Sequence, residues 1–142
     1  MSSNLMDFAM LIAALEEQWE KQQTTIKKES KLKTKIIDKN NIQISSQYLI
    51  YSLNKPGVLR EFFLSANSPN FNLDLTIDEY TVSRNFNNLL TLSSYVNFID
   101  AFQDNQKYII HLGQLNWREK FKLSITPLNS ITIYNLLCII DE

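Results

Sequence analysis

The N-terminal part of the chain carries apolar residues at alternating steps of three and four positions. Side chains at this spacing line one face of an α-helix, and a seven-residue repeat favours packing against a partner helix. The pattern therefore predicts a long helix over residues 1–28 that docks on another chain as a coiled coil. The predicted contact seam has one polar member, Gln22. Its apolar members are Leu5, Phe8, Ile12, Leu15, Trp19 and Ile26.

An uninterrupted apolar run over residues 8–15 makes the first turns of this helix apolar on nearly all sides. A helix that is apolar all round is buried on all sides, which fits an oligomerisation element. The run is too short to span a bilayer, for which about 20 apolar residues are needed. A signal peptide needs a basic residue before such a run, and the only charge there is Asp7. We therefore expect no membrane span and no signal peptide, with synthesis in the cytoplasm.

A lysine-rich stretch follows the predicted helix. Residues 27–39 contain six lysines against Glu29 and Asp38, and no glycine or proline. The main interpretation is a solvated linker over residues 29–41. The alternative is a basic strip that contacts phosphates or an acidic partner; no aromatic residue is interleaved with it, which argues against stacking on bases. The lysines that would make such contacts are Lys27, Lys28, Lys31, Lys33 and Lys35.

The remaining chain alternates apolar and polar residues with the period of a β-strand. The clearest case is residues 71–78, which predict a strand with one buried face and one wet face. Residues 81–86 are predicted to return antiparallel to it. Residues 48–65 are predicted as a hairpin around the turn at residues 54–57, in which Gly57 supplies a positive φ.

Later segments continue the β pattern. Residues 87–94 fit a short helix or turn that covers the end of a sheet, and residues 107–112 and 117–126 are predicted strands. The last predicted strand, residues 131–140, is apolar on both sides, which indicates burial on both faces or at an interface. About seven or eight short strands predict a mainly β (α+β) fold over residues 42–142, an antiparallel β-sandwich with the jelly roll as one form of it.

Composition narrows the classes of function. The chain of 142 residues has a formal net charge of −1, which argues against nucleic-acid binding by the whole domain. Its two glycines, Gly57 and Gly113, are too few for a glycine-rich phosphate loop. Cys138 is the single cysteine and has apolar neighbours, so we expect a buried thiol and no internal disulfide. The absence of disulfides favours a reducing compartment or a particle assembled inside a cell.

Few residues are candidates for catalysis. His111 is the only histidine and lies in an apolar predicted strand, where a structural role is expected. A nucleophile activated by histidine would need this residue, and Cys138 lies in a different apolar strand. Asp74, Asp78 and Glu79 form the only tight acidic group; the main interpretation is a solvated strand face, and the alternative is a hard cation such as Ca²⁺. We therefore predict no enzyme activity, no cofactor and no metal site.

Aromatic side chains support a second hypothesis, a glycan-binding β-sandwich anchored by the helix. Aromatic rings can form a platform for sugars, although such residues more often belong to a sheet core or an interface. The candidates for such a platform are Tyr48, Tyr51, Tyr80, Tyr95 and Trp117.

Two adjacent segments, residues 56–65 (PGVLREFFLS) and 68–78 (SPNFNLDLTID), place a proline-containing loop between two strands, the second of which ends in an acidic turn. This layout resembles small β-sandwich structural proteins of tailed phages and other viruses. Residues 86–94 and 108–126 fit the same layout. The resemblance implies a non-enzymatic component of a virion or phage tail and brings no catalytic residues with it.

These patterns together favour a structural or assembly protein. We expect the N-terminal helix to dock on copies of the same chain or on neighbouring subunits, with Phe8 and Trp19 as the main contacts. Localisation in a virion or another assembled particle follows from this hypothesis. A chain without residues 1–28 is then expected to fold but not to assemble.

Overall fold

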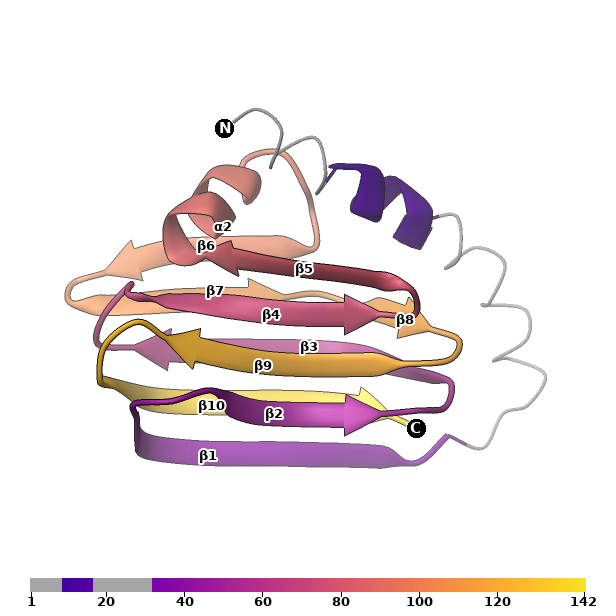
Figure 1. The fold of residues 1–142 in the computed structure, drawn as a ribbon, viewed down its shortest axis with the longest axis horizontal. Coiled ribbons are helices and arrows are strands. Elements are labelled where there is room, and N and C mark those ends of the chain that lie inside the picture. The colour runs from indigo at the N-terminus through magenta and orange to yellow at the C-terminus, as the bar shows by residue number, and fades with distance from the viewer. Residues whose placement is uncertain (1–8, 17–31) are drawn as a thin grey trace.

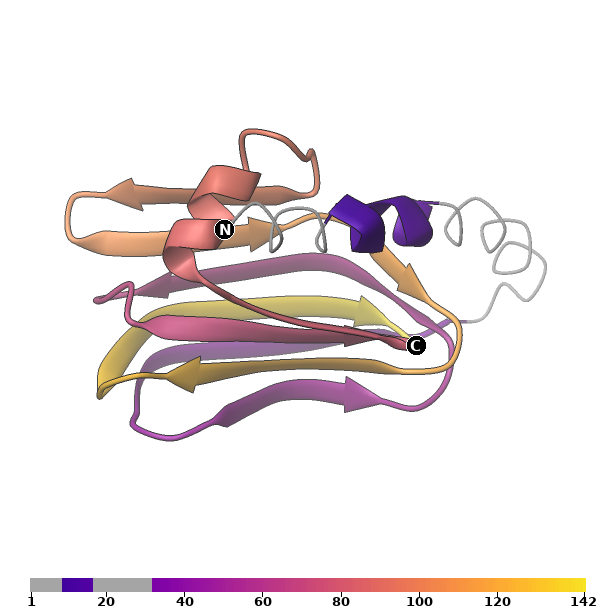
Figure 2. The same cartoon turned by 45° about the horizontal axis from the view of Figure 1, so that its top comes forward.

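The computed structural model describes residues 9–16 and 32–142. Within these residues the chain is mostly β-strand, and every strand pair is antiparallel. Two sheets pack face to face in a sandwich-like arrangement (Figures 1 and 2). The prediction of a mainly β chain with an antiparallel sandwich is therefore confirmed.

The larger sheet, named sheet A here, has six strands: β1 (Thr34–Ile44), β3 (Gly57–Ala66), β6 (Ile99–Asp104), β7 (Lys107–Leu112), β8 (Leu115–Trp117) and β10 (Ile131–Asp141). Five of them lie in the order β1-β10-β3-β7-β6. The sixth, β8, pairs with the first residues of β3, beyond the part of β3 that pairs with β7. The strand predicted at residues 131–140 thus lies inside the sheet, between β1 and β3.

The smaller sheet, sheet B, has four strands: β2 (Tyr48–Leu53), β4 (Phe71–Ile77), β5 (Tyr80–Asn85) and β9 (Phe121–Pro127). Their order is β2-β9-β4-β5, and β4 pairs with β5 as the sequence predicts. The predicted hairpin over residues 48–65 is wrong, because β2 and β3 belong to different sheets. Gly57 does not have a positive φ either. The chain at residues 54–56 crosses from one sheet to the other instead of turning back on itself.

The core fills the space between the sheets, because alternate side chains of each strand point inward. Trp117 is its largest fully buried side chain. The indole stacks on Phe121, with ring centroids 4.1 Å apart, and its Nε1–H donates a hydrogen bond of 2.8 Å to the carbonyl oxygen of Lys55. The stacking and the hydrogen bond hold the indole from two sides. Trp117 therefore fixes how β8 and β9 approach each other.

The short helix α2 (Phe86–Leu92) covers one edge of the sandwich (Figure 1). It begins directly after β5 because the side chain of Asn85 caps it, accepting a 2.8 Å hydrogen bond from the backbone N–H of Asn88. The ring of Phe86 contacts Phe71 of sheet B and Tyr108 of sheet A, at centroid distances of 6.3 Å and 5.4 Å. A helix that covers the end of a sheet is one of the two forms predicted for this region.

Residues 9–16 are the described part of the predicted N-terminal helix, and they form a short helix. This segment packs on the sandwich of its own chain, since Leu11 and Leu15 are only 3% and 6% exposed and belong to the core. Ile12 is partly buried against the same core. Leu15 is predicted to contact another chain and lies in its own domain instead. The prediction that this run is buried on all sides is wrong for residues 9–15, since Met10 is 71% exposed. A run that is apolar on nearly all sides does not select which stripe turns inward.

The first strand includes much of the predicted linker. β1 begins at Thr34 and pairs along its length with β10, so residues 34–41 belong to the sheet and the β-domain begins before residue 42. β1 lies at the edge of sheet A, where lysines are favoured because they oppose pairing with other chains. A lysine-rich edge strand and a lysine-rich linker have similar sequences, which explains why the sequence predicts a linker where the structure has a strand.

Candidate functional site: the outer face of sheet A

The side of sheet A that faces away from the core carries several apolar side chains. Phe63 and Ile109 point to this side, because their neighbours on β3 and β7 belong to the core. The strand register places Leu137 opposite Phe63, and Phe102 opposite Ile109. We define the outer face of sheet A by the six apolar residues on this side: Ile36, Phe63, Phe102, Ile109, Leu137 and Ile139.

Several of these side chains are open to solvent. Ile36 is 63% exposed and Phe102 is 41% exposed, on the two edge strands of the sheet. Between them Phe63 and Leu137 are half-buried, and Ile109 is only 8% exposed. Contiguous apolar surface of this kind is typical of interaction sites, whereas single exposed apolar residues are common on any surface.

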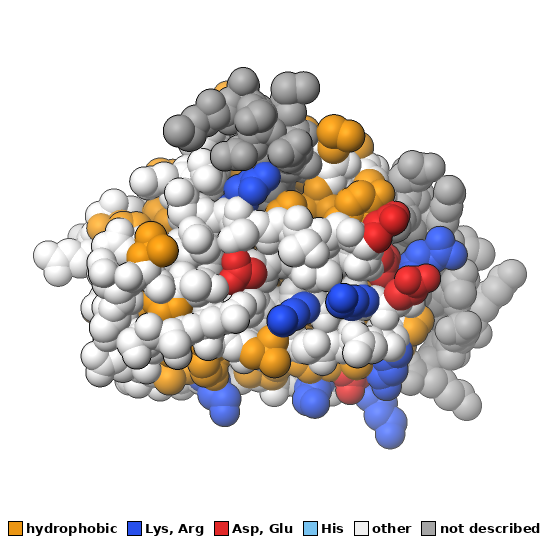
Figure 3. Space-filling view, viewed as in Figure 1, with side chains coloured by type: hydrophobic (Ala, Val, Ile, Leu, Met, Phe, Trp, Pro, Cys, Tyr) orange, Lys and Arg blue, Asp and Glu red, His pale blue; other side chains and the backbone are white. Residues whose placement is uncertain are grey.

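The outer side of sheet B is different. The carboxylate of Asp74 accepts hydrogen bonds from Ser83 and Thr126, each 2.6 Å long, and from Ser124 at 3.5 Å. The space-filling view shows this side covered mostly by uncharged polar groups (Figure 3). Asp74 is therefore satisfied by hydroxyl groups of its own sheet, whereas the sequence predicts a solvated strand face.

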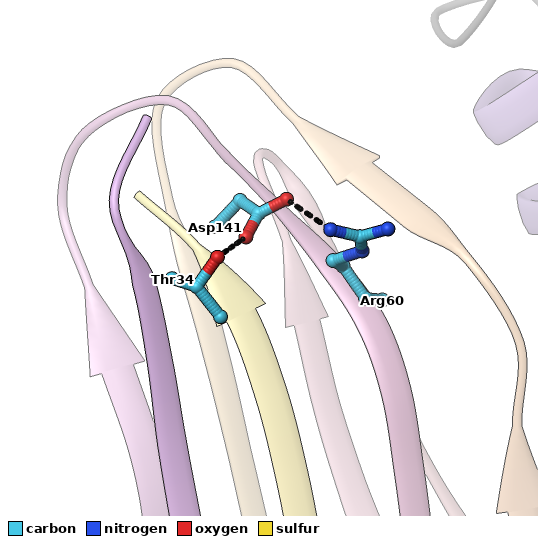
Figure 4. A network of polar contacts seen from close by, with 3 residues as sticks. All are labelled: Thr34, Arg60 and Asp141. Carbon is cyan, nitrogen blue, oxygen red and sulfur yellow. Dashed lines mark hydrogen bonds and ion pairs between the residues drawn. The ribbon is translucent and has the colours of Figure 1, made fainter. Parts of the chain in front are cut away.

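A groove of about 710 Å³ lies at one end of the outer face, and Ile139 belongs to both. The carboxylate of Asp141 links three strands there: it accepts a 2.7 Å hydrogen bond from Thr34 of β1, and it lies 3.4 Å from the guanidinium of Arg60 of β3 (Figure 4). The Arg60 side chain is largely exposed, so this ion pair is worth less than about 1 kcal/mol. The groove lining is Leu32, Val58, Arg60, Glu61, Gln114, Ile139 and Asp141.

Charged side chains lie at both ends of the outer face, and at one end Lys107 lies opposite Asp104 of β6. His111 lies on it, with Nε2 3.6 Å from the carboxylate of Glu61. At the far end of β7 the ammonium group of Lys107 lies 5.8 Å from the ring centroid of Tyr134. His111 is thus a partly exposed surface residue next to a carboxylate, and not a side chain enclosed by the core.

Asp78, in the turn after β4, has a structural role. Its backbone has a φ of 55°, and its carboxylate accepts hydrogen bonds from the backbone N–H groups of Arg118, Glu119 and Lys120 at 3.0, 2.7 and 3.1 Å. This carboxylate therefore fixes the loop that leads into β9. Among residues 9–16 and 32–142, no group of three or more His, Cys, Asp or Glu side chains is arranged to hold a metal ion.

Cys138 lies in the core on β10, and burial raises the pKa of its thiol to about 12. We expect iodoacetamide to label it far more slowly in the folded chain than in the unfolded chain, because the thiolate is the reactive form. Below pH 9.0, the ordinary pKa of a thiol, Cys138 is protonated in both states, so it does not change the free energy of unfolding. Between pH 9.0 and about 12 the thiol ionises more readily in the unfolded chain, so the free energy of unfolding falls as the pH rises. The checks are labelling followed by mass spectrometry and denaturation at alkaline pH.

Cys138→Val is the control, since it keeps the apolar volume and has no ionisable group. The alkaline loss of stability should be smaller in this variant than in the natural chain. Equal labelling rates with and without denaturant would show that the thiol is accessible.

The structure separates the other predicted site residues. Lys33 and Lys35 are exposed at the edge of sheet A, and the ammonium group of Lys35 lies 5.6 Å from the ring centroid of Tyr51. The remaining members of the predicted seam and of the predicted lysine strip lie outside the described residues: Leu5, Phe8, Trp19, Ile26, Lys27, Lys28 and Lys31.

The five aromatic residues predicted as a sugar platform do not form one surface. Tyr51 and Trp117 are buried in the core, and Tyr48 and Tyr80 are half-buried against it. Tyr95 is the exposed member of the set. The sequence pattern cannot distinguish an exposed aromatic residue from a core residue in strands of this composition.

Sequence analysis did not identify the outer face of sheet A as a site. One sequence feature could have indicated it: residues 131–140 are apolar on both sides of the predicted strand. Leu137 and Ile139 are the apolar residues on its outward side. The other members come from β1, β3, β6 and β7, and they meet only when these strands pair.

Comparison with known proteins assigns no family to this chain. No protein-family model matches the sequence, and no curated protein matches it significantly. In the part of the chain that the structure describes, no helix is both long and apolar enough to cross a membrane.

Proposed function

We propose that this protein is a non-enzymatic structural subunit of a virion or a phage-tail-like particle, and that it associates with further copies of itself through the outer face of sheet A. The observation that carries this proposal is the difference between the two sheets. Sheet B has a polar outer side, as expected of a sheet with one face on the core and one in water. The outer side of sheet A instead carries apolar side chains, as do surfaces that bind another protein.

We further infer that the sandwich is a jelly roll. In its favour, the pairings β1 with β10, β2 with β9, β3 with β7 and β4 with β5 are nested, as if one long hairpin had folded over to make both sheets. β6 then extends one sheet beyond β7. Jelly rolls occur in viral capsid domains and in lectins. Because a fold does not by itself define a function, the outer face carries the functional argument.

A second copy of the chain is the partner that we propose for this face. A two-fold axis that lies in the plane of the face and runs across the strands places each end of the face opposite the other end of the partner. Lys107 at one end would then approach Glu61 at the other end of the second copy, and Asp104, opposite Lys107 on β6, reduces this attraction. The apolar side chains between the two ends therefore carry the proposed contact.

The size of the face is sufficient for a weak contact. Five strands spaced about 4.8 Å apart, with about six residues each at 3.4 Å per residue, give a flat area of roughly 500 Å². Stable interfaces bury about 800 Å² per partner, and weak ones less. We therefore expect a dimer that depends on protein concentration when the chain is studied alone, and further contacts within a particle.

The test is the molar mass of the full-length chain by sedimentation velocity over a range of concentrations. We expect the natural chain to associate, and Phe102→Asp to remain a monomer at concentrations where the natural chain is a dimer. Phe102 is a suitable position because it lies on an edge strand and is partly exposed, so the charge should disturb folding little.

Leu49→Asp is the matched control. Leu49 is 52% exposed and lies opposite Ser124, on the outer side of sheet B. This variant should associate like the natural chain. A natural chain that stays monomeric at every concentration, or an equal effect of both variants, would contradict the proposal.

A further inference from the structure

The only histidine of the chain, His111, lies within the surface that the proposed dimer covers. On β7 it is directly opposite Phe63 of β3, one of the six apolar residues that define the outer face of sheet A. Its side chain is 38% exposed, so water and protons reach it in the single chain. Histidine ordinarily changes its charge between about pH 5 and pH 8, so the charge of this face can follow the pH of the surroundings.

Two carboxylates flank this histidine. Nε2 of His111 lies 3.6 Å from the carboxylate of Glu61 on β3, and the strand register places Asp100 of β6 directly opposite His111. Opposite residues of an antiparallel strand pair extend to the same side of the sheet, with Cβ atoms about 5 Å apart. Because β7 lies between β3 and β6, His111 has an acidic side chain on each neighbouring strand.

The other charged side chains of these three strands occur in pairs of opposite sign. Arg60 of β3 lies 3.4 Å from the carboxylate of Asp141. At the far end of β7, Lys107 is opposite Asp104 of β6. The two-fold axis proposed above brings this second pair of the other copy toward Glu61, so it adds one charge of each sign. Protonation of the histidine is therefore the step that changes the balance of charge at this end of the face.

We propose that self-association through the outer face of sheet A is controlled by pH, with His111 protonated in the dimer and the dimer favoured at acidic pH. This inference rests on the proposed function, since it describes the regulation of the same contact. A second copy displaces water from Glu61 and Asp100, which disfavours unpaired carboxylates and strengthens their attraction to a cation. Protonation of His111 lowers the net charge of these three side chains from two negative charges to one. Association then takes up protons, and by linkage its equilibrium constant rises as the pH falls.

The experiment is sedimentation velocity of the full-length chain over a concentration series at about pH 8 and about pH 5.5, at constant ionic strength. We expect the dimerisation constant of the natural chain to be about tenfold larger at the lower pH, because the two histidines of a dimer each take up part of a proton. His111→Gln should dimerise with the same constant at both pH values. His111→Lys is charged at both, so at the higher pH it should dimerise as the natural chain does at the lower one.

A variant that combines Glu61→Gln with Asp100→Asn should reverse the direction of the effect. Without the carboxylates, protonation places a single cation under the second copy, so this dimer should weaken as the pH falls. The side chains of His111 and Glu61 are 38% and 55% exposed, so their replacement should leave the thermal midpoint unchanged.

The outcomes separate this inference from the proposed function. A dimer whose constant does not change with pH, or changes equally in the natural chain and in His111→Gln, overturns the control by pH and leaves the assembly proposal standing. A natural chain that is monomeric at both pH values overturns the two together.

Discussion

Replacing Gly57 by alanine is expected to lower the free energy of unfolding by about 3 kcal/mol, at the upper end of the loss usual for overpacked cores. An added Cβ would lie 2.6 Å from Cζ2 of Trp117 and 2.9 Å from the backbone oxygen of Asp141. Neither neighbour can move easily. The indole is fixed by its stack on Phe121 and by its hydrogen bond to the Lys55 carbonyl, and Asp141 ends a strand that pairs on both sides.

The measurement is thermal unfolding followed by circular dichroism, with an expected fall of roughly 10 °C in the midpoint for a chain of this size. Gly113→Ala is the matched control, because its Cβ would have ordinary contacts of 3.5 to 3.7 Å with Phe98. The alanine keeps the N–H that donates to the Phe98 carbonyl at 2.7 Å. A midpoint for Gly57→Ala equal to that of the natural chain would show that β3 can move away from β8.

Leu11→Ala and Leu15→Ala are each expected to lower the free energy of unfolding by about 2 kcal/mol, near the lower end of the range for buried leucines. Both side chains belong to the core although they come from the N-terminal segment, on one face of a helix and four positions apart. The loss should be the same at every protein concentration, because the contacts are within one chain. Denaturant unfolding at two concentrations, with sedimentation velocity for the mass, makes this measurement.

Met10→Ala is the control within the same segment, since Met10 is 71% exposed and its truncation should change stability by less than about 0.5 kcal/mol. The competing hypothesis is that this helix docks on another chain. It would be favoured if Leu15→Ala lowered the mass of the particle and left the unfolding of the monomer unchanged.

Some elements follow directly from local sequence. The alternation of residues 71–78 predicts β4 because a single sheet covers one face of that strand and solvent wets the other. The neighbouring segment returns beside it after the two-residue turn at Asp78 and Glu79, so β5 is also predicted. In contrast, the turn at residues 54–57 has the composition of a hairpin, and the adjoining strands still separate, because each finds a longer-range partner, β9 or β10.

The candidate site depends still more on distant contacts. Leu137 and Phe63 are far apart in the chain and become neighbours only through the pairing of β10 with β3. No local pattern encodes this contact.

The sequence alone determined the class of the fold, since period-two alternation predicts strands and the scarcity of glycine excludes phosphate-loop folds. It did not determine which side chains of residues 9–15 are buried: Leu11 and Leu15 belong to the core, whereas Met10 is 71% exposed. The tertiary structure decided this, which strands pair, and which apolar side chains remain on the outer side of sheet A. The physical reason is that strand order and helix docking depend on contacts between distant residues, whereas periodicity reports only which side of each element avoids water.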